Sequence, residues 1–236
     1  LYQRTATHLS AIRSRSPDPA LVARLSQLVL RARAALTGGP AFSWRSVGRF
    51  FTVGFPVAVY RAAPWWLGVT AVFVGLSAVL MWYVSSHPEV PGMLLSDEQI
   101  DDLVNSGFAG YYTEYQPQNF ALRVWTNNAF LAAQCLAGGV LVLPVVYVLG
   151  VNALSLGIVG GIMIGAGRAD VFFGLLTPHG LLELTAIFVA AGFGLRIGWA
   201  WIAPGPFRTR GRALAQTARE GMLVALGLVP VLFISG

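Results

Sequence analysis

Residues 177–201, with the sequence TPHGLLELTAIFVAAGFGLRIGWAW, constrain the fold more than any other part of this chain. The stretch is apolar and long enough to cross a bilayer, which needs about 20 residues of helix. It nevertheless carries His179, Glu183 and Arg196. An ionisable side chain near the middle of a bilayer costs about 2.5–3.5 kcal/mol on insertion scales. We therefore expect this helix to pack against partners that satisfy its polar groups.

The composition is typical of an integral membrane protein. Hydrophobic residues make up 56% of the 236 residues and charged residues only 11%, whereas soluble domains carry about 25% charged residues. The single cysteine, Cys135, lies in an apolar segment, which excludes an intrachain disulfide. We predict an all-α, polytopic membrane protein with about five transmembrane helices and a cytoplasmic N-terminal helical region.

Two regions of the chain differ sharply in composition. Residues 1–62 contain nine arginines and one aspartate, which indicates a basic helical region in the cytoplasm or at the membrane interface. Residues 63–236 form the predicted transmembrane helical domain. Its spans are expected at residues 64–86, 124–150, 152–167, 178–203 and 219–236, with an acidic extracytoplasmic loop at residues 87–120.

The distribution of charge predicts the orientation in the membrane. Residues 1–62 and 204–220 are rich in arginine, whereas residues 87–120 carry acidic side chains and no arginine. Basic residues are enriched in the cytoplasmic loops of membrane proteins. With about five spans, both arginine-rich regions fall on one side and the acidic loop on the other. We therefore expect a multi-pass protein with a cytoplasmic N terminus, and with Glu183 toward the outer face.

Small residues recur at four-residue spacing on two of the predicted spans. Such a strip lets two helix backbones approach closely. We predict that both strips are helix-packing faces, and a homodimer through the glycine faces is one arrangement that they allow. The residues are Gly157, Gly161 and Gly165 in the third span, and Ala190, Gly194 and Gly198 in the fourth.

Polar side chains inside the spans form the candidate functional site. Neighbouring asparagines at the start of the second span are unusual, because unpaired amides are costly in hydrocarbon. Thr177 and Pro178 are expected to cap and begin the fourth span. His179 and Glu183 then lie one helical turn apart on one face of the helix. We group these residues as a polar seam: Asn127, Asn128, His179, Glu183 and Arg196.

Three interpretations of the polar seam remain open. Its residues form buried hydrogen bonds that set the helix register, or a proton or ion relay, or a hydrolytic or metal site. The third has the least support, since His-x-x-x-Glu offers two ligands and neither H-E-x-x-H nor G-x-S-x-G occurs. We assign no catalytic residue, no metal ligand and no cofactor. The membrane topology accounts for the net charge of +6, so we expect no nucleic-acid partner.

The order of these motifs resembles the stage II sporulation protein M family, over residues 60–236. The motifs are paired Asn127-Asn128 before a span rich in small residues, a glycine-rich span, Pro178-His179-Gly180, Glu183 and Gly194-x-Arg196. The resemblance implies a multi-pass protein of the bacterial cytoplasmic (inner) membrane. Every basic residue is arginine, which fits an actinobacterial-type member from a GC-rich host.

The resemblance also implies a role and partners. Relatives in endospore formers anchor an engulfment complex that contains cell-wall hydrolases. Relatives in other bacteria tend to be encoded beside a MoxR-type ATPase, a von Willebrand-like protein and an RDD-domain protein. We expect a non-enzymatic scaffold or anchor of a cell-envelope complex, linked to peptidoglycan remodelling and in contact with the lipid bilayer. The alternative is a permease-like transport or channel component with an intramembrane His179/Glu183 relay.

Overall fold

The structure is a computed structural model, and it describes residues 19–37, 43–107, 117–206 and 208–235. The chain divides into two compact units, Leu1–Gly48 and Arg49–Gly236. In the first unit, helix α2 (Pro19–Thr37) carries the exposed side chains of Arg24 and Arg31. The division at residue 48 comes earlier in the chain than the predicted boundary at residue 62.

The second unit begins before the first span because a short helix packs onto the bundle. Helix α3 (Trp44–Arg49) contains the division between the units, and it is followed by a π-helical segment, η1 (Phe50–Gly54), and by α4 (Phe55–Arg61). The Phe55 ring occupies the space that a Cβ atom at Gly227 would need. Helix α4 therefore belongs to the membrane unit.

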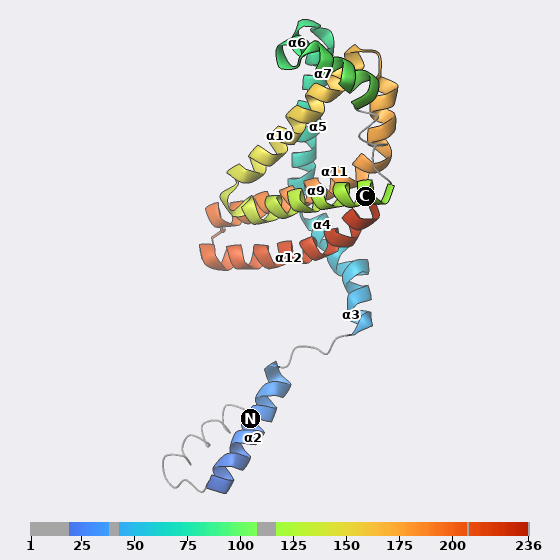
Figure 1. The fold of residues 1–236 in the computed structure, drawn as a ribbon. Coiled ribbons are helices and arrows are strands. Elements are labelled where there is room, and N and C mark those ends of the chain that lie inside the picture. The colour runs from blue at the N-terminus through green and yellow to red at the C-terminus, as the bar shows by residue number, and fades with distance from the viewer. Residues whose placement is uncertain (1–18, 38–42, 108–116, 207, 236) are drawn as a thin grey trace. The chain divides into compact units, whose positions relative to one another are not determined.

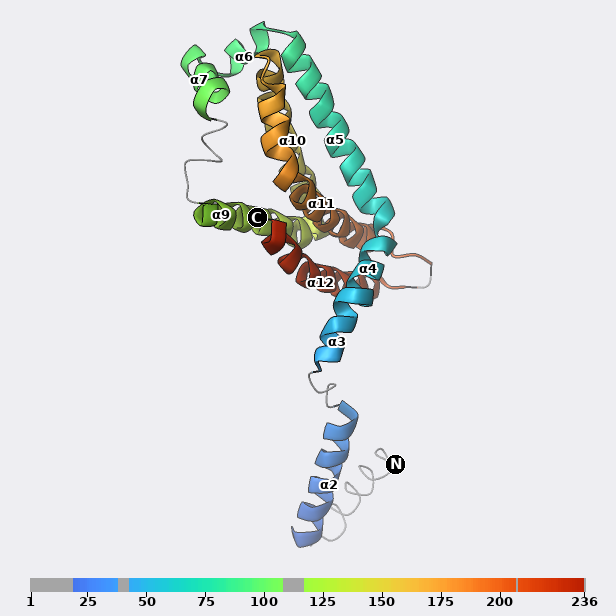
Figure 2. The same ribbon diagram turned by 90° about the vertical axis from the view of Figure 1, so that its right-hand side faces the viewer.

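The described part of the second unit consists of helices and their connections (Figures 1 and 2). Among the described residues, four helical segments are long and apolar enough to cross a membrane: α5, α10, α12 and residues Gly180–Ile202 of α11. This confirms the predicted class, an all-α polytopic membrane protein. In chain order the elements are α5 (Ala63–Ser86), α6 (Glu89–Leu94), α7 (Asp97–Asp102), η2 (Leu103–Gly107), α9 (Pro117–Gly138), η3 (Gly139–Leu141), α10 (Leu143–Gly165), α11 (Ala169–Ile202) and α12 (Arg210–Ser235).

The second and third spans have different bounds from those predicted. Instead of one helix over residues 124–150, the chain forms α9 and then turns through η3 into α10, which includes most of the predicted third span. Val142 makes this turn with φ of 63°, an outlier for a β-branched residue. Helix α9 is not among the four apolar segments, since it carries Arg123, Asn127 and Asn128. The count of about five spans therefore stays a prediction.

Helix α11 begins earlier than predicted. It starts at Ala169, so Thr177 and Pro178 lie inside the helix and do not cap or begin it. Pro178 has no N–H group for the carbonyl of Gly174, and prolines at such positions bend helices. Figures 1 and 2 show that α11 changes direction along its length. It packs against α10 and α5, and also against α9 and α12.

Helices α5 and α10 pack closely and run in the same direction. Gly157 of α10 faces Leu80 of α5, and Gly161, one turn later, faces Val84. Both helices therefore end near α6 and α7, as Figure 2 shows. In both views α9 and α12 cross α5 steeply. Because parallel helices need a return connection, residues 87–142 must carry the chain back from the end of α5 to the start of α10.

Glycines also bring α11 against the end of α9. A Cβ atom at Gly194 would overlap the carbonyl oxygen of Cys135, and one at Gly198 would overlap the carbonyl oxygen of Gly139. Ala190 is fully buried. Five of the six residues in the two predicted strips are thus buried within the chain, whereas Gly165 is exposed. The homodimer stays a prediction.

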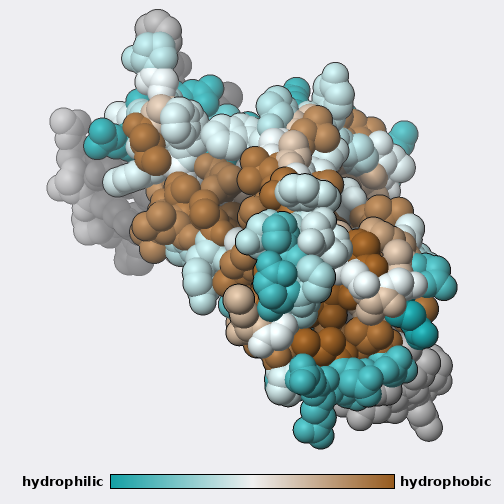
Figure 3. All heavy atoms as spheres, turned by 90° about the horizontal axis from the view of Figure 1, so that it is seen from above, coloured by the Kyte–Doolittle hydropathy of each residue, from teal (hydrophilic) through white to brown (hydrophobic). Residues whose placement is uncertain are grey.

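The surface of the unit carries exposed apolar and aromatic side chains. Trp65 at the start of α5 lies 6.2 Å from Trp199 at the end of α11, measured between ring centroids. Trp82 and Tyr83 are exposed at the other end of α5. Aromatic residues gather at both membrane–water interfaces in many membrane proteins. Seen from the α6–α7 end, hydrophobic patches lie between hydrophilic groups (Figure 3).

We predict that Gly161→Ala destabilises the bundle and that Gly150→Ala, on the same helix, does not. A Cβ atom at position 161 would lie 2.6 Å from Val84 Cβ and 3.0 Å from the Met81 carbonyl oxygen. Separating the helices to admit it costs about 1–3 kcal/mol. A Cβ atom at position 150 meets nothing within 4 Å, and alanine favours helix over glycine by about 1 kcal/mol.

Thermal unfolding of the detergent-solubilised protein, followed by tryptophan fluorescence, measures both effects. Equal unfolding temperatures for the two variants would contradict the close contact between α5 and α10.

Candidate functional site

The centre of the candidate site is a hydrogen bond between α9 and α11. Asn128 Nδ2 donates to Glu183 Oε2 at 2.8 Å, and both side chains are only 8% exposed. Asn127 Nδ2 donates to Asn128 Oδ1 at 3.4 Å. The same two helices meet again further along, where Gly194 lies against the Cys135 carbonyl group. The two contacts occur in the same order along both helices, so α9 and α11 run parallel.

One oxygen of Glu183 has no partner. Glu183 Oε1 is buried and accepts no hydrogen bond. Buried polar atoms of native proteins are almost always paired, so an exception needs a physical explanation. A buried carboxylate also loses its hydration, which makes an uncompensated charge expensive at this position. The Glu183 side chain is therefore only half satisfied by the helices around it.

Glu183 lines a cavity of about 660 Å³ between α5, α9, α10 and α11. Helix α10 contributes Asn152 and Ser155 to the wall, and α9 contributes Asn128. Asn152 Nδ2 donates to the Val148 carbonyl oxygen at 2.8 Å, which leaves Asn152 Oδ1 as an acceptor. The remaining lining residues are glycine or apolar. The cavity is thus largely apolar, with a few acceptor groups in its wall.

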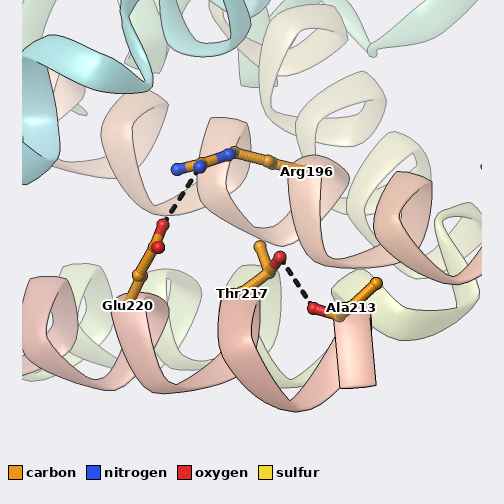
Figure 4. A network of polar contacts seen from close by, with 4 residues as sticks. All are labelled: Arg196, Ala213, Thr217 and Glu220. Atoms are coloured by element: carbon orange, nitrogen blue, oxygen red, sulfur yellow. Dashed lines mark hydrogen bonds and ion pairs between the residues drawn. The ribbon is translucent and has the colours of Figure 1, made fainter. Parts of the chain in front are cut away.

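Arg196 lies apart from this cluster. Its Nη2 forms an ion pair with Glu220 Oε2 of α12 at 3.0 Å, where the two side chains are 27% and 36% exposed (Figure 4). The guanidinium carbon lies 5.6 Å from the centroid of the Phe193 ring. The residues of the predicted polar seam therefore fall into two clusters. One joins α11 to α9, and the other joins α11 to α12.

The two clusters are separated by a closely packed apolar segment of α11. Residues 184–195 contain no charged side chain. Seven of them are at most 7% exposed: Ala186, Ile187, Phe188, Val189, Ala190, Ala191 and Phe193. At 1.5 Å per residue, Glu183 and Arg196 lie about 20 Å apart along the helix. The middle of the span thus forms part of the packed core.

Three further residues bear on the predicted polar seam: His179, Asn152 and Glu220. The backbone of His179 belongs to α11, but its side chain lies outside the described part of the structure. The His179/Glu183 pair therefore stays a prediction. Sequence reasoning missed Asn152, although a polar side chain inside an apolar span is a recognisable sign of an interior-facing residue. It also missed Glu220 as the partner of Arg196, because Glu220 was grouped with the arginine-rich residues 204–220.

Among the described residues, no group of three or more His, Cys, Asp or Glu side chains is placed to hold a metal ion. Cys135 is a free, fully buried thiol. The absence of catalytic, metal and cofactor sites stays a prediction for the chain as a whole.

The fold and the site define a polytopic helical membrane protein with polar groups buried around one central helix. The chain belongs to the stage II sporulation protein M family, because the family model described as "Stage II sporulation protein M" matches residues 69–236. This confirms the resemblance seen in the sequence, and the family is not a known enzyme family. A second model, "Domain of unknown function (DUF8413)", matches residues 1–38. Searches of curated proteins and of solved structures found no match.

We predict that Glu183→Leu destabilises the fold more than Glu183→Gln. Glutamine keeps an acceptor oxygen for Asn128 Nδ2, whereas leucine leaves that buried donor unpaired at a cost of about 1–3 kcal/mol. Adding Asn128→Leu to Glu183→Leu should recover much of the loss, because both partners are then apolar.

Unfolding midpoints of the single and double variants in detergent give the coupling energy between the two side chains. An equal loss for glutamine and leucine would show that the charge of Glu183, and not its hydrogen bond to Asn128, is required.

Proposed function

We propose that this membrane protein is a non-enzymatic scaffold or anchor subunit of a cell-envelope complex, linked to peptidoglycan remodelling. The observation that supports this role over transport is the packed apolar segment of α11 between Glu183 and Arg196. A permease needs a polar path across the bilayer, whereas these two polar clusters are about 20 Å apart along a tightly packed helix. A closed core suits a subunit that acts through its surfaces.

The acidic segment after α5 offers a surface for partners. Ser96 and Gln99 form a capping box at the start of α7, with Gln99 N donating to Ser96 Oγ at 3.3 Å and Ser96 N donating to Gln99 Oε1 at 2.9 Å. This cap holds the exposed side chains of Asp97, Glu98 and Asp101 on a formed helix. The partners we propose are cell-wall hydrolases, or a MoxR-type ATPase with von Willebrand-like and RDD-domain proteins.

We also propose that the chain crosses a bacterial inner membrane about five times, with its N terminus in the cytoplasm. Helices α5 and α10 run parallel, so α9 has to cross in the opposite direction if both of them span the membrane. The bond between Asn128 and Glu183 supports this crossing, because it satisfies an amide that would otherwise be costly in hydrocarbon. The arginines of residues 45–61 and 208–219 then share the cytoplasmic side.

Variants that each add one cysteine test this topology, since the native cysteine, Cys135, is fully buried and gives no labelling background. Ser46→Cys, Glu98→Cys and Arg210→Cys place a thiol at exposed positions. We expect a membrane-impermeant maleimide to label Glu98→Cys in intact spheroplasts, and to label the other two only after lysis. Labelling of Glu98→Cys and Arg210→Cys from the same side would contradict a crossing by α9.

Affinity purification tests the scaffold role. We expect the tagged full chain, cross-linked in its native membranes and purified in mild detergent, to retain cell-wall hydrolases or the ATPase group. The matched variant Asp97→Asn/Glu98→Gln removes two exposed charges without touching the helix bundle, and should lose partners that bind the acidic segment. Recovery of the chain alone after cross-linking would count against the scaffold role.

The cavity at Glu183 favours one alternative, a permease-like transport or channel component. Flux measured in proteoliposomes separates the two functions. We expect no ion or solute flux above that of empty liposomes. A flux that depends on the protein and disappears in Glu183→Gln would replace the scaffold with the transport role.

A further inference from the structure

We infer that the cavity beside Glu183 binds an organic cation, a molecule with a protonated amine on an apolar body. This inference goes beyond the scaffold role and does not depend on it. It rests on the chemistry of the cavity wall, on the lack of a compensating charge there, and on the size of the space.

The cavity wall offers several hydrogen-bond acceptors. Glu183 Oε1 is buried without a partner, on a residue that is 8% exposed. One N–H of Asn152 Nδ2 donates to the Val148 carbonyl oxygen, and Asn152 Oδ1 is available as an acceptor. The Ser155 hydroxyl lies in the same wall and can also accept. Ammonium groups carry three donors and no acceptor, so they match this set.

The described lining residues supply no positive charge. None of them is lysine, arginine or histidine, and the side chain of His179 lies outside the described structure. Arg196 on the same helix is paired with Glu220, about 20 Å along α11 from Glu183. A carboxylate that is buried without a counter-charge is strongly disfavoured. A bound cation would provide the missing charge and the missing hydrogen-bond donor together.

The size of the cavity favours an organic cation over a bare metal ion. Its volume of about 660 Å³ falls within the roughly 300–1,000 Å³ of small-molecule sites. Metal ions such as Ca²⁺ need several oxygen ligands at about 2.3–2.6 Å, and the described residues hold no cluster of acidic or histidine side chains for one. The rings of Phe73 and Phe172 and the aliphatic walls suit an apolar body.

The cavity wall is accessible from outside beside α10, where Ser155 is exposed and Asn152 is half-buried. On the α11 side the wall includes Leu184 and Ile187, and the packed segment follows. A ligand can therefore enter beside α10. The amine can belong to the headgroup of an amino lipid or to a free amphiphilic amine.

Octylamine is a suitable probe, with octanol as the matched molecule that lacks the charge. Binding is measured by native mass spectrometry on the full chain in phosphatidylcholine nanodiscs. We expect saturable octylamine binding and no saturable octanol binding. Glu183→Gln should weaken octylamine binding by at least about tenfold, through loss of a charged hydrogen bond. Glu220→Gln removes a carboxylate outside the cavity and should leave the affinity unchanged.

A second variant keeps the test decisive if Glu183→Gln fails to fold. Ser155→Phe fills the opening without altering the bond between Asn128 and Glu183, and should abolish octylamine binding. Absence of saturable binding, equal affinity in wild type and both cavity variants, or equal binding of octanol would overturn the inference. Adding phosphatidylethanolamine to the nanodiscs identifies the source of the bound amine. If this lipid competes with octylamine, the site binds a lipid headgroup. If it does not compete, the site binds a free amine, and both results support the site.

Discussion

The backbone contact between α11 and the end of α9 is the constraint on which the rest of the bundle depends. A Cβ atom at Gly139 would overlap the backbone of Gly194, and Gly198 lies equally close to the Gly139 carbonyl oxygen. In lipid, helices gain little from burying apolar surface, so van der Waals contact of this kind supplies the association. The same contact fixes the register of two parallel helices and thereby sets Glu183 opposite Asn128.

Residue types predicted the class of the protein, and local signals predicted only some of the helix bounds. The apolar run at residues 64–86 matches α5, because length and composition are properties of one segment. The break at Val142 was missed because the sequence stays apolar on both sides of it. Gly138, Gly139 and Pro144 are the local residues that interrupt this run. Pro178 fits the first turn of a helix as well as a bend within one, and only packing against other helices decides between them.

Local sequence signals identified individual residues of the candidate site, but they did not predict which of these residues are in contact. Asn128 and Glu183 stand out in the sequence as polar groups in apolar spans, which marks them as interior residues. Their bond joins positions 55 residues apart, and no local pattern records which helices become neighbours. For that reason the sequence joined Arg196 to the same seam, whereas the fold turns it toward Glu220 on α12.

The cavity and the acidic segment are connected through η2. Leu103, the first residue after α7, lines the cavity together with side chains from four helices. A ligand that binds only the folded arrangement stabilises it by RT ln(1 + [L]/Kd), or about 2.7 kcal/mol at one hundred times Kd. That stabilisation acts on the contacts between α5, α9, α10 and α11, and on the start of η2. Because α7 leads directly into η2, a ligand held beside Glu183 would also stabilise the segment that carries the exposed Asp97 and Glu98. The packed middle of α11 therefore fits the proposed scaffold, in which a ligand is held inside the core and partners bind at the surface.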